Sequence, residues 1–157
     1  MEILLIISKS IAAGFAGVGF AILFNVPQRT LFPIGILSAL GGIVKFGSMY
    51  FEIGIVFASF LAAIIIGIVS IRMAYSKDSP PLVFYIPSVI PLVPGFFMYK
   101  MMLGIMSLTS VTDTNIYLQN LIATVNNGTK AIFILISLGI GVAVPMLITR
   151  KETIKKK

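Results

Sequence analysis

The fold is decided by the stretch Ile86-Pro87-Ser88-Val89-Ile90-Pro91-Leu92-Val93-Pro94-Gly95-Phe96-Phe97-Met98-Tyr99-Lys100, which sets three prolines and a glycine inside an apolar segment of membrane length. Proline lacks the N–H group that would bond four residues back in a helix. The pattern therefore predicts a broken helix, in which the carbonyls of Val83, Pro87 and Ile90 lose their usual donors. Such groups are costly in hydrocarbon, so we expect the break to pack against protein or to line a hydrated cavity.

A half-helix that restarts at Pro94 would present the free N–H groups of Gly95, Phe96 and Phe97, and this positive helix end favours a carboxylate. Discontinuous helices of this kind form substrate sites in several secondary transporters. The alternative is a proline-kinked packing helix that binds no ligand. On the transporter interpretation, the predicted substrate pathway consists of Val83, Pro87, Ile90, Pro91, Pro94, Gly95, Phe96, Tyr99 and Lys45.

The composition indicates an all-α integral membrane protein. The chain has 157 residues, of which 58% are hydrophobic and 11% are charged. It contains no cysteine, histidine or tryptophan, which removes disulfides, thiol chemistry, imidazole catalysis and most transition-metal sites. The sequence also lacks a metal-ligand spacing, a phosphate-binding loop and a nucleophile with a base. We therefore expect no enzyme activity, no cofactor and no metal.

Hydropathy predicts five transmembrane helices, the fourth of which contains the break, within a single membrane domain of residues 1–149. We expect the first of them to be retained rather than cleaved as a signal peptide. The predicted spans are about 3–23, 31–50, 53–73, 82–108 and 130–148.

A short amphipathic helix is predicted at about 113–127, before the fifth span. Leu118, Leu121 and Val125 follow a helical spacing, and Asp113 is placed to cap the start. This helix either lies on the outer surface or extends the last span, and Asn126-Asn127-Gly128 is its predicted end.

The distribution of basic residues predicts the orientation. Five of the twelve cations lie in the tail at 150–157, which we interpret as a cytoplasmic anchor against anionic lipid rather than a nucleic-acid site. Five spans with the C-terminus in the cytoplasm also place Arg29, Arg72 and Lys77 inside. The positive-inside rule therefore predicts an external N-terminus and a cytoplasmic C-terminus.

Among the lysines in or beside the spans, Lys45 is the strongest functional candidate. It lies in the glycine-rich segment 41–47, where an interior-facing ammonium would attract an anionic group. The alternative, for Lys45 as for Lys9 and Lys100, is a long side chain that reaches the headgroups. No Asp or Glu lies deep in a predicted span, so we expect no proton relay within this chain.

Two further features concern the first two spans. Phe24-Asn25-Val26-Pro27-Gln28-Arg29 predicts a tight turn between antiparallel neighbours, in which Asn25 and Pro27 shape the turn and Arg29 is an anchor to the cytoplasmic face. Small residues recur every four positions and predict close, inward-facing helix contacts. These pairs are Ala12/Ala16, Ala13/Gly17, Gly35/Ala39 and Ser38/Gly42.

The turn at 24–29 and the stretch at 86–95, with Tyr99 after it, together resemble the threonine/serine exporter family. The chain as a whole resembles the small, five-span subunit of that family. The resemblance implies an inner-membrane exporter of small hydrophilic metabolites that works with a larger membrane subunit. Some relatives are associated with dicarboxylate (succinate) export, which leaves the substrate open.

The hypothesis that follows is a subunit of a heteromeric secondary exporter, with threonine or serine as the first expected substrates. The partners we expect are the larger subunit, the lipid bilayer and further copies in a homo- or hetero-oligomer, and not nucleic acid. The alternatives are a succinate-like dicarboxylate exporter subunit and a membrane scaffold that transports nothing.

Overall fold

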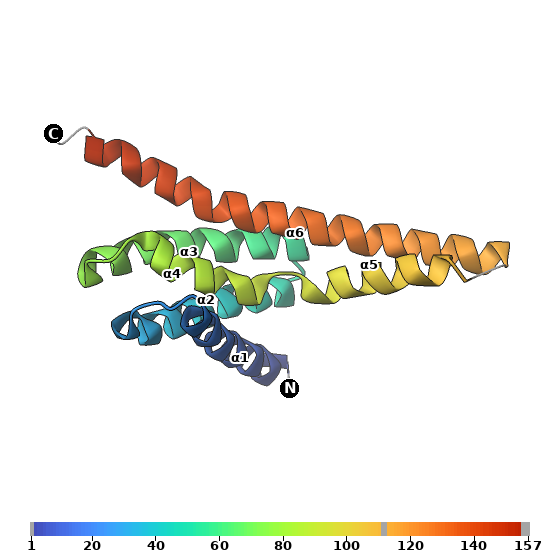
Figure 1. Cartoon of the computed structure of the whole chain (residues 1–157), viewed down its shortest axis with the longest axis horizontal. Helices are drawn as coiled ribbons and strands as arrows, with labels where there is room; N and C mark the ends of the chain where they lie inside the picture. The colour runs from blue at the N-terminus through green and yellow to red at the C-terminus, as the bar shows by residue number, and fades with distance from the viewer. Residues whose placement is uncertain (1, 111–112, 155–157) are drawn as a thin grey trace. The chain divides into compact units, whose positions relative to one another are not determined.

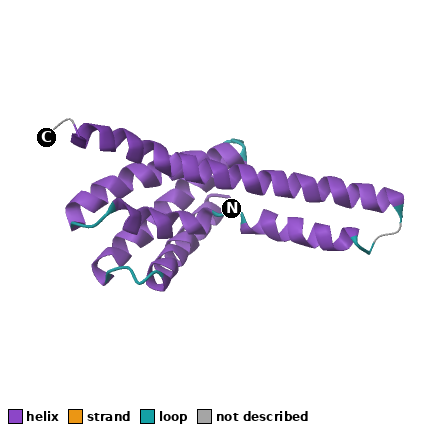
Figure 2. Cartoon of the chain, turned by 45° about the horizontal axis from the view of Figure 1, so that its top comes forward, coloured by secondary structure: helices purple, strands orange, loops and turns teal. Residues whose placement is uncertain are grey.

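The computed structural model describes residues 2–110 and 113–154, with side chains described as far as Thr149. All regular structure in these ranges is helical, without a strand (Figure 2). The elements, in chain order and coloured along the chain in Figure 1, are α1 (Glu2–Leu23), η1 (Gln28–Thr30), α2 (Leu31–Tyr50), α3 (Ile55–Lys77), α4 (Pro81–Val89), η2 (Ile90–Leu92), α5 (Gly95–Leu108) and α6 (Thr114–Ile154).

Four helices in the described ranges are long and apolar enough to cross a membrane: α1, η1 with α2, α3 and α6. The count rises to five if α4, η2 and α5 are taken as one interrupted span. Large apolar side chains such as Phe15, Phe32 and Phe57 are exposed, which a helix bundle in water would not tolerate over so many positions. The prediction of an all-α integral membrane protein is confirmed.

The chain forms two compact units, the first made of residues 1–93 and 137–157 and the second of residues 94–136. In the first unit, α1 and α2 are antiparallel neighbours held together by small residues. A Cβ added to Gly14 would lie 3.0 Å from the Gly35 carbonyl oxygen, and one added to Gly42 would lie 3.0 Å from the Cα of Ser10. The two backbones therefore approach each other as the small-residue spacing predicted.

One of the predicted small-residue pairs does not contribute to this contact. Ala13, Gly17, Ser38 and Gly42 are buried, as expected, but Ala12 and Ala16 lie on the exposed face of α1. The prediction that this pair faces inward is therefore wrong. A helix presents only one stripe to its neighbour, and in α1 that stripe is occupied by Ala13 and Gly17.

The turn between α1 and α2 closes through the backbone of Asn25, which has a φ of 54°. Its N–H donates to the Ile22 carbonyl, and the N–H of Val26 donates to the Ala21 carbonyl. These two hydrogen bonds provide donors for carbonyl groups in the last turn of α1. Asparagine suits this left-handed position better than most side chains do. The Pro27 carbonyl then accepts the N–H and the hydroxyl of Thr30, at 2.9 and 2.7 Å, and this starts α2.

The fourth predicted span is interrupted at one point rather than at each proline. Pro87 stays inside α4, and Pro91 occupies the first turn of η2. The helical backbone stops only at Val93, whose ψ of 138° is the conformation that a following proline favours. Ile90 also precedes a proline but stays helical, with a φ of −57° and a ψ of −40°. Pro94 then caps α5, which begins at Gly95.

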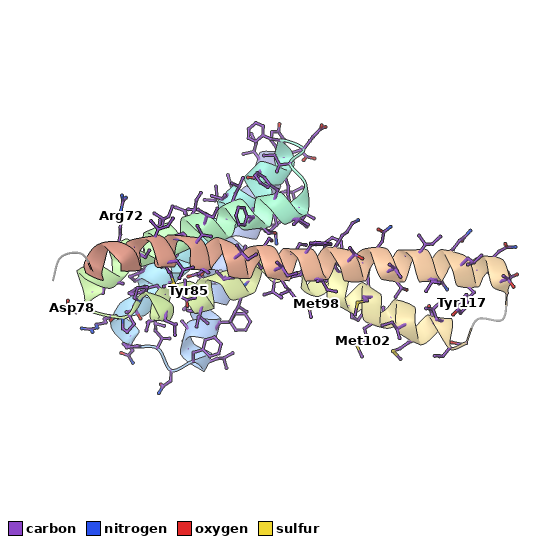
Figure 3. The ribbon with its side chains drawn as sticks, turned by 90° about the horizontal axis from the view of Figure 1, so that it is seen from above. Arg72, Asp78, Tyr85, Met98, Met102 and Tyr117 are labelled. Atoms are coloured by element: carbon purple, nitrogen blue, oxygen red, sulfur yellow. The ribbon has the colours of Figure 1, made fainter. Side chains whose placement is uncertain are left out.

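The second unit is a hairpin formed by α5 and the first part of α6. The Asp113 carboxylate accepts the N–H of Asn115 at 2.8 Å, so the predicted cap is confirmed. Gly104 of α5 lies directly against Thr124 of α6. In Figure 3, Met98 and Met102 lie along α5 and Tyr117 lies near the start of α6.

The predicted end of the amphipathic helix at Asn126-Asn127-Gly128 is wrong, because α6 continues without interruption from Thr114 to Ile154. Glycine weakens a helix interior by only about 1 kcal/mol, and here it has a packing role. A Cβ on Gly128 would come within 2.7 Å of the Met101 sulfur, so its absence gives room to α5. Of the two predicted alternatives, the structure shows the amphipathic segment as an extension of the last span.

Candidate functional site

The main candidate site lies in the first unit, where η2, the last helical turn before the helix is interrupted at Val93, meets α2. The side chain of Lys45 is only 6% exposed, and its ammonium donates to the Leu92 carbonyl at 2.7 Å. Lys45 therefore does not reach out to the headgroups in this structure but turns into the unit. The two residues are 47 positions apart, so the hydrogen bond depends on how the helices pack.

The glycine-rich segment around Lys45 brings this side chain and η2 close together. A Cβ on Gly41 would lie 2.5 Å from the terminal methyl of Ile66 and 3.3 Å from a methyl of Leu92. Gly41 therefore lets both α3 and η2 approach α2 one turn before Lys45. Leu92 is itself 1% exposed, so its carbonyl and the ammonium meet away from solvent.

The carbonyls at the break are not arranged as the sequence predicted. The Ile90 carbonyl is not free, because the 3-10 turn of η2 brings the N–H of Val93 to it at 3.0 Å. The N–H of Phe97 is likewise not free, since it donates to the Pro94 carbonyl at 3.1 Å. The Leu92 carbonyl, which sequence reasoning missed, is the one that a charged side chain reaches.

A signal for Leu92 was present in the sequence. Val93 precedes Pro94 and is therefore biased towards extended backbone, which favours a helix end at Leu92. The same bias applies to Ile86 and Ile90, which stay helical, so the signal alone did not single out Leu92. The donor could not be identified in the same way, because the sequence does not reveal which side chain of another helix faces that carbonyl.

The other predicted pathway residues are distributed over both units. In the first unit, Pro87 is buried, and Val83, Ile90 and Pro91 are partly exposed. The Pro87 carbonyl faces α1, where a Cβ on Gly17 would lie 3.6 Å from its oxygen. This carbonyl is therefore packed against protein, which is one of the two environments expected for it.

In the second unit, Pro94 is buried, whereas Gly95, Phe96 and Tyr99 are exposed. The Lys100 ammonium lies 4.5 Å from the centre of the Phe96 ring, and Lys130 lies 5.7 Å from the centre of the Phe97 ring. These contacts occupy the aromatic faces with cations of the same unit.

Buried hydroxyls occur on each of the helices α1 to α4 of the first unit. Those of Ser10, Ser38, Ser70 and Ser88 each donate to a carbonyl of their own helix, three or four residues back. Ser59 of α3 is also fully buried, but its hydroxyl has no hydrogen-bond partner among the described residues. Most buried polar groups in proteins are satisfied, so this hydroxyl stands out as an unused donor and acceptor.

At one end of the first unit, the turn after α1 meets the turn after α3. The Arg29 guanidinium donates to the Ser79 hydroxyl at 3.3 Å. Ser79 lines a cavity of about 370 Å³. The other lining residues are Ile71, Ala74, Tyr75, Asp78, Pro81, Met146 and Thr149.

Comparison with known proteins gives a family. The model of the family described as "Threonine/Serine exporter, ThrE" matches residues 9–148. An uncharacterized protein of Haemophilus influenzae is 29% identical over 140 residues, which cover 89% of this chain and 46% of the relative. The chain thus spans about half the length of that relative. No solved structure matches this chain. The family match covers residues of both units and both sides of the helix interruption at Val93. The chain belongs to the threonine/serine exporter family, ThrE.

Proposed function

We propose that this chain is a subunit of a heteromeric inner-membrane exporter of small hydrophilic metabolites, with threonine and serine as its first substrates. The observation that carries the proposal is the buried Lys45 ammonium, which is hydrogen-bonded to the backbone carbonyl at the end of η2. A buried cation with a single neutral partner is costly, so such a residue in a membrane helix points to an anionic ligand.

In this proposal Lys45 supplies the positive charge that receives the carboxylate of the substrate. The Leu92 carbonyl holds the ammonium while no substrate is present, and it is released when a carboxylate takes its place. A carboxylate is the stronger acceptor, because hydrogen bonds between charged groups are roughly twice as strong as neutral ones. The unused hydroxyl of Ser59 in α3 is a further polar group of the same unit.

The proposed assembly contains a larger membrane subunit and more than one chain. Support comes from the length of the relative, of which this chain covers 46%. The proposed orientation has the N-terminus outside and the C-terminus in the cytoplasm. In support, Arg29, Arg72 and Lys77 all belong to the end of the first unit at which Arg29 contacts Ser79.

The test is export in cells that express the full chain together with the larger subunit. Efflux of threonine, serine and succinate is measured in parallel, and assembly of the complex is verified by co-purification. We expect threonine and serine efflux to rise above that of cells that lack this chain. Unchanged efflux of all three, with the complex verified, would reject the proposal.

The two alternatives give different results in the same assay. Succinate export alone would favour the dicarboxylate exporter, because the Lys45 ammonium can also receive a carboxylate of succinate. A scaffold should tolerate replacement of Pro91 and Pro94 by alanine with assembly and function retained. The exporter should lose flux in that variant while expression remains largely intact.

A further inference from the structure

The cavity at the end of α3 is lined by an acidic residue, Asp78, at a helix C-terminus that disfavours negative charge. Asp78 follows the last turn of α3 with a φ of 46°, and its N–H donates to the Ala74 carbonyl. Glycine or asparagine is the usual residue in this left-handed cap. In addition, the C-terminal end of a helix carries a partial negative charge, so a carboxylate there is repelled. Aspartate tolerates the left-handed conformation, but the helix end disfavours its negative charge.

The Asp78 carboxylate has no ion-pair partner among the described side chains, which end at Thr149. Asp78 itself is exposed. The Arg29 guanidinium donates instead to the hydroxyl of the neighbouring Ser79, at 3.3 Å. The Arg29 guanidinium therefore contacts the residue next to Asp78 but forms no ion pair with the Asp78 carboxylate. In Figure 3, Asp78 lies at the end of α3 while Arg72, one helix turn or more before it, projects away from the ribbon.

The size and lining of the cavity suit a small polar ligand with an apolar part. Its volume of about 370 Å³ falls at the lower end of the range for ligand pockets, roughly 300–1,000 Å³. Asp78 and Ser79 supply the polar groups, and Ile71, Ala74 and Met146 supply apolar surface. Because Ser79 is itself a lining residue, the Arg29 guanidinium stands at the edge of the same cavity.

We propose that this cavity is a binding site for a zwitterionic amino acid, in which Asp78 receives the ammonium group and Arg29 receives the carboxylate. The inference rests on the proposed function and adds a second binding site to it, separate from Lys45. A dicarboxylate would place its second negative charge near Asp78, so the site discriminates against succinate. The site lies at the end of the unit that is proposed to face the cytoplasm, where an exporter collects its substrate.

The experiment measures binding directly and does not require transport. The full chain, co-purified with the subunit that it assembles with, is placed in nanodiscs and examined by saturation-transfer NMR. The probes are L-threonine, N-acetyl-L-threonine, which lacks the ammonium, L-threoninol, which lacks the carboxylate, and succinate. We expect the wild-type chain to bind threonine more tightly than the other three.

Two variants separate the roles of the charges. Asp78→Asn should weaken threonine binding about tenfold or more, the scale of a lost hydrogen bond between charged groups, but leave N-acetyl-threonine binding unchanged. Arg29→Gln should weaken threonine by a similar factor and leave threoninol unchanged. Asparagine is well suited to the left-handed cap, so Asp78→Asn should not lower the unfolding temperature.

The matched control is Glu52→Gln. Glu52 is also an exposed acidic residue with a left-handed backbone, at a φ of 60°, but it lies in the turn between α2 and α3. It should have no effect on the binding of any probe. Succinate binding tighter than threonine binding, or threonine binding that Asp78→Asn leaves unchanged, would overturn the inference.

The same materials distinguish this inference from the proposed function. If efflux is absent but the binding pattern holds, the exporter proposal fails and the zwitterion site stands. If threonine efflux occurs and the half-saturating internal concentration does not change in Asp78→Asn, the site is wrong and the exporter proposal stands.

Discussion

Lys45 of α2 and Leu92 of η2 are joined by a hydrogen bond of 2.7 Å between the ammonium and the backbone carbonyl. The bond connects a charged side chain to the last residue before the backbone becomes extended at Val93. A displacement of η2 therefore changes the environment of the buried charge, and a ligand that attracts the charge releases the end of η2. The hydrogen bond therefore couples the Lys45 ammonium, the proposed substrate-binding group, to the interruption of the helix at Val93.

Replacing Lys45 by methionine tests this coupling. The side chain keeps a similar length and loses its charge, and neutral replacement of a buried ion is often tolerated because the desolvation cost disappears. The Leu92 carbonyl loses its donor, which costs about 1–3 kcal/mol. We expect at least a tenfold fall in threonine efflux, a factor that corresponds to about 1.4 kcal/mol, with assembly retained.

The control for this variant is Lys9→Met, because Lys9 is an exposed lysine in α1 with its ammonium 5.6 Å from the centre of the Phe46 ring. Efflux should remain near the wild-type rate in Lys9→Met. Equal efflux in the two variants would show that the buried charge has no part in transport.

Ser59→Ala should stabilise the protein or leave its stability unchanged. The buried Ser59 hydroxyl has no hydrogen-bond partner among the described residues, so its removal relieves a desolvation cost of about 1–3 kcal/mol. The unfolding temperature in detergent measures the effect. Ser70→Ala is the comparison, because the Ser70 hydroxyl donates to the Gly67 carbonyl at 2.8 Å and its loss should not raise stability. A clear loss of stability in Ser59→Ala alone would mean that the hydroxyl has a partner in the membrane-embedded protein.

The sequence was sufficient to predict features that depend on nearby residues. Asn25 predicted the turn after α1, Asp113 the start of α6, and Pro94 the restart of a helix at Gly95, because each acts on backbone within a few positions. The predicted end of the amphipathic segment was wrong because a long helix tolerates a glycine at a cost of about 1 kcal/mol, and Gly128 lies where a side chain would crowd Met101.

The candidate site was predictable only in part, for the same physical reason. The glycine-rich surroundings singled out Lys45, and the proline pattern singled out the stretch that contains Leu92. Their hydrogen bond was not predicted, because it depends on the distance between α2 and η2, which the side chains of Ile66 and Leu92 set by packing on Gly41. The cavity beside Asp78 likewise requires α6 to lie against the end of α3.

Gly17→Ala should loosen the contact of α1 with α2. An added Cβ would overlap the side chain of Ser38, which is fully buried and hydrogen-bonded to the Ile34 carbonyl at 2.9 Å. Overpacking of this kind costs about 1–3 kcal/mol. Gly19→Ala is the matched control two residues later, since a Cβ there meets nothing within 4 Å. A fall in unfolding temperature for Gly17→Ala but not for Gly19→Ala would support the packing, and equal behaviour would contradict it.

The hairpin of the second unit gives a prediction that a double mutant can test. A Cβ on Gly104 would overlap the hydroxyl of Thr124 and come within 2.9 Å of its Cβ, so Gly104→Ala should separate α5 from α6. The Thr124 side chain is held in place because its hydroxyl donates to the Asn120 carbonyl at 2.6 Å. We expect a loss of about 1–3 kcal/mol in stability, the usual cost of overpacking.

Thr124→Ala removes the hydroxyl and the methyl group that the new Cβ would meet, although the Thr124 Cβ itself remains. The double variant Gly104→Ala/Thr124→Ala should therefore recover part of the stability that Gly104→Ala loses. The two residues are in contact, so the effects should not add, and the coupling is read from the unfolding temperatures of the four proteins in the cycle. Additive losses would show that α5 and α6 do not pack through Gly104 and Thr124. Partial recovery would show that α5 and the first part of α6 pack against each other through Gly104 and Thr124.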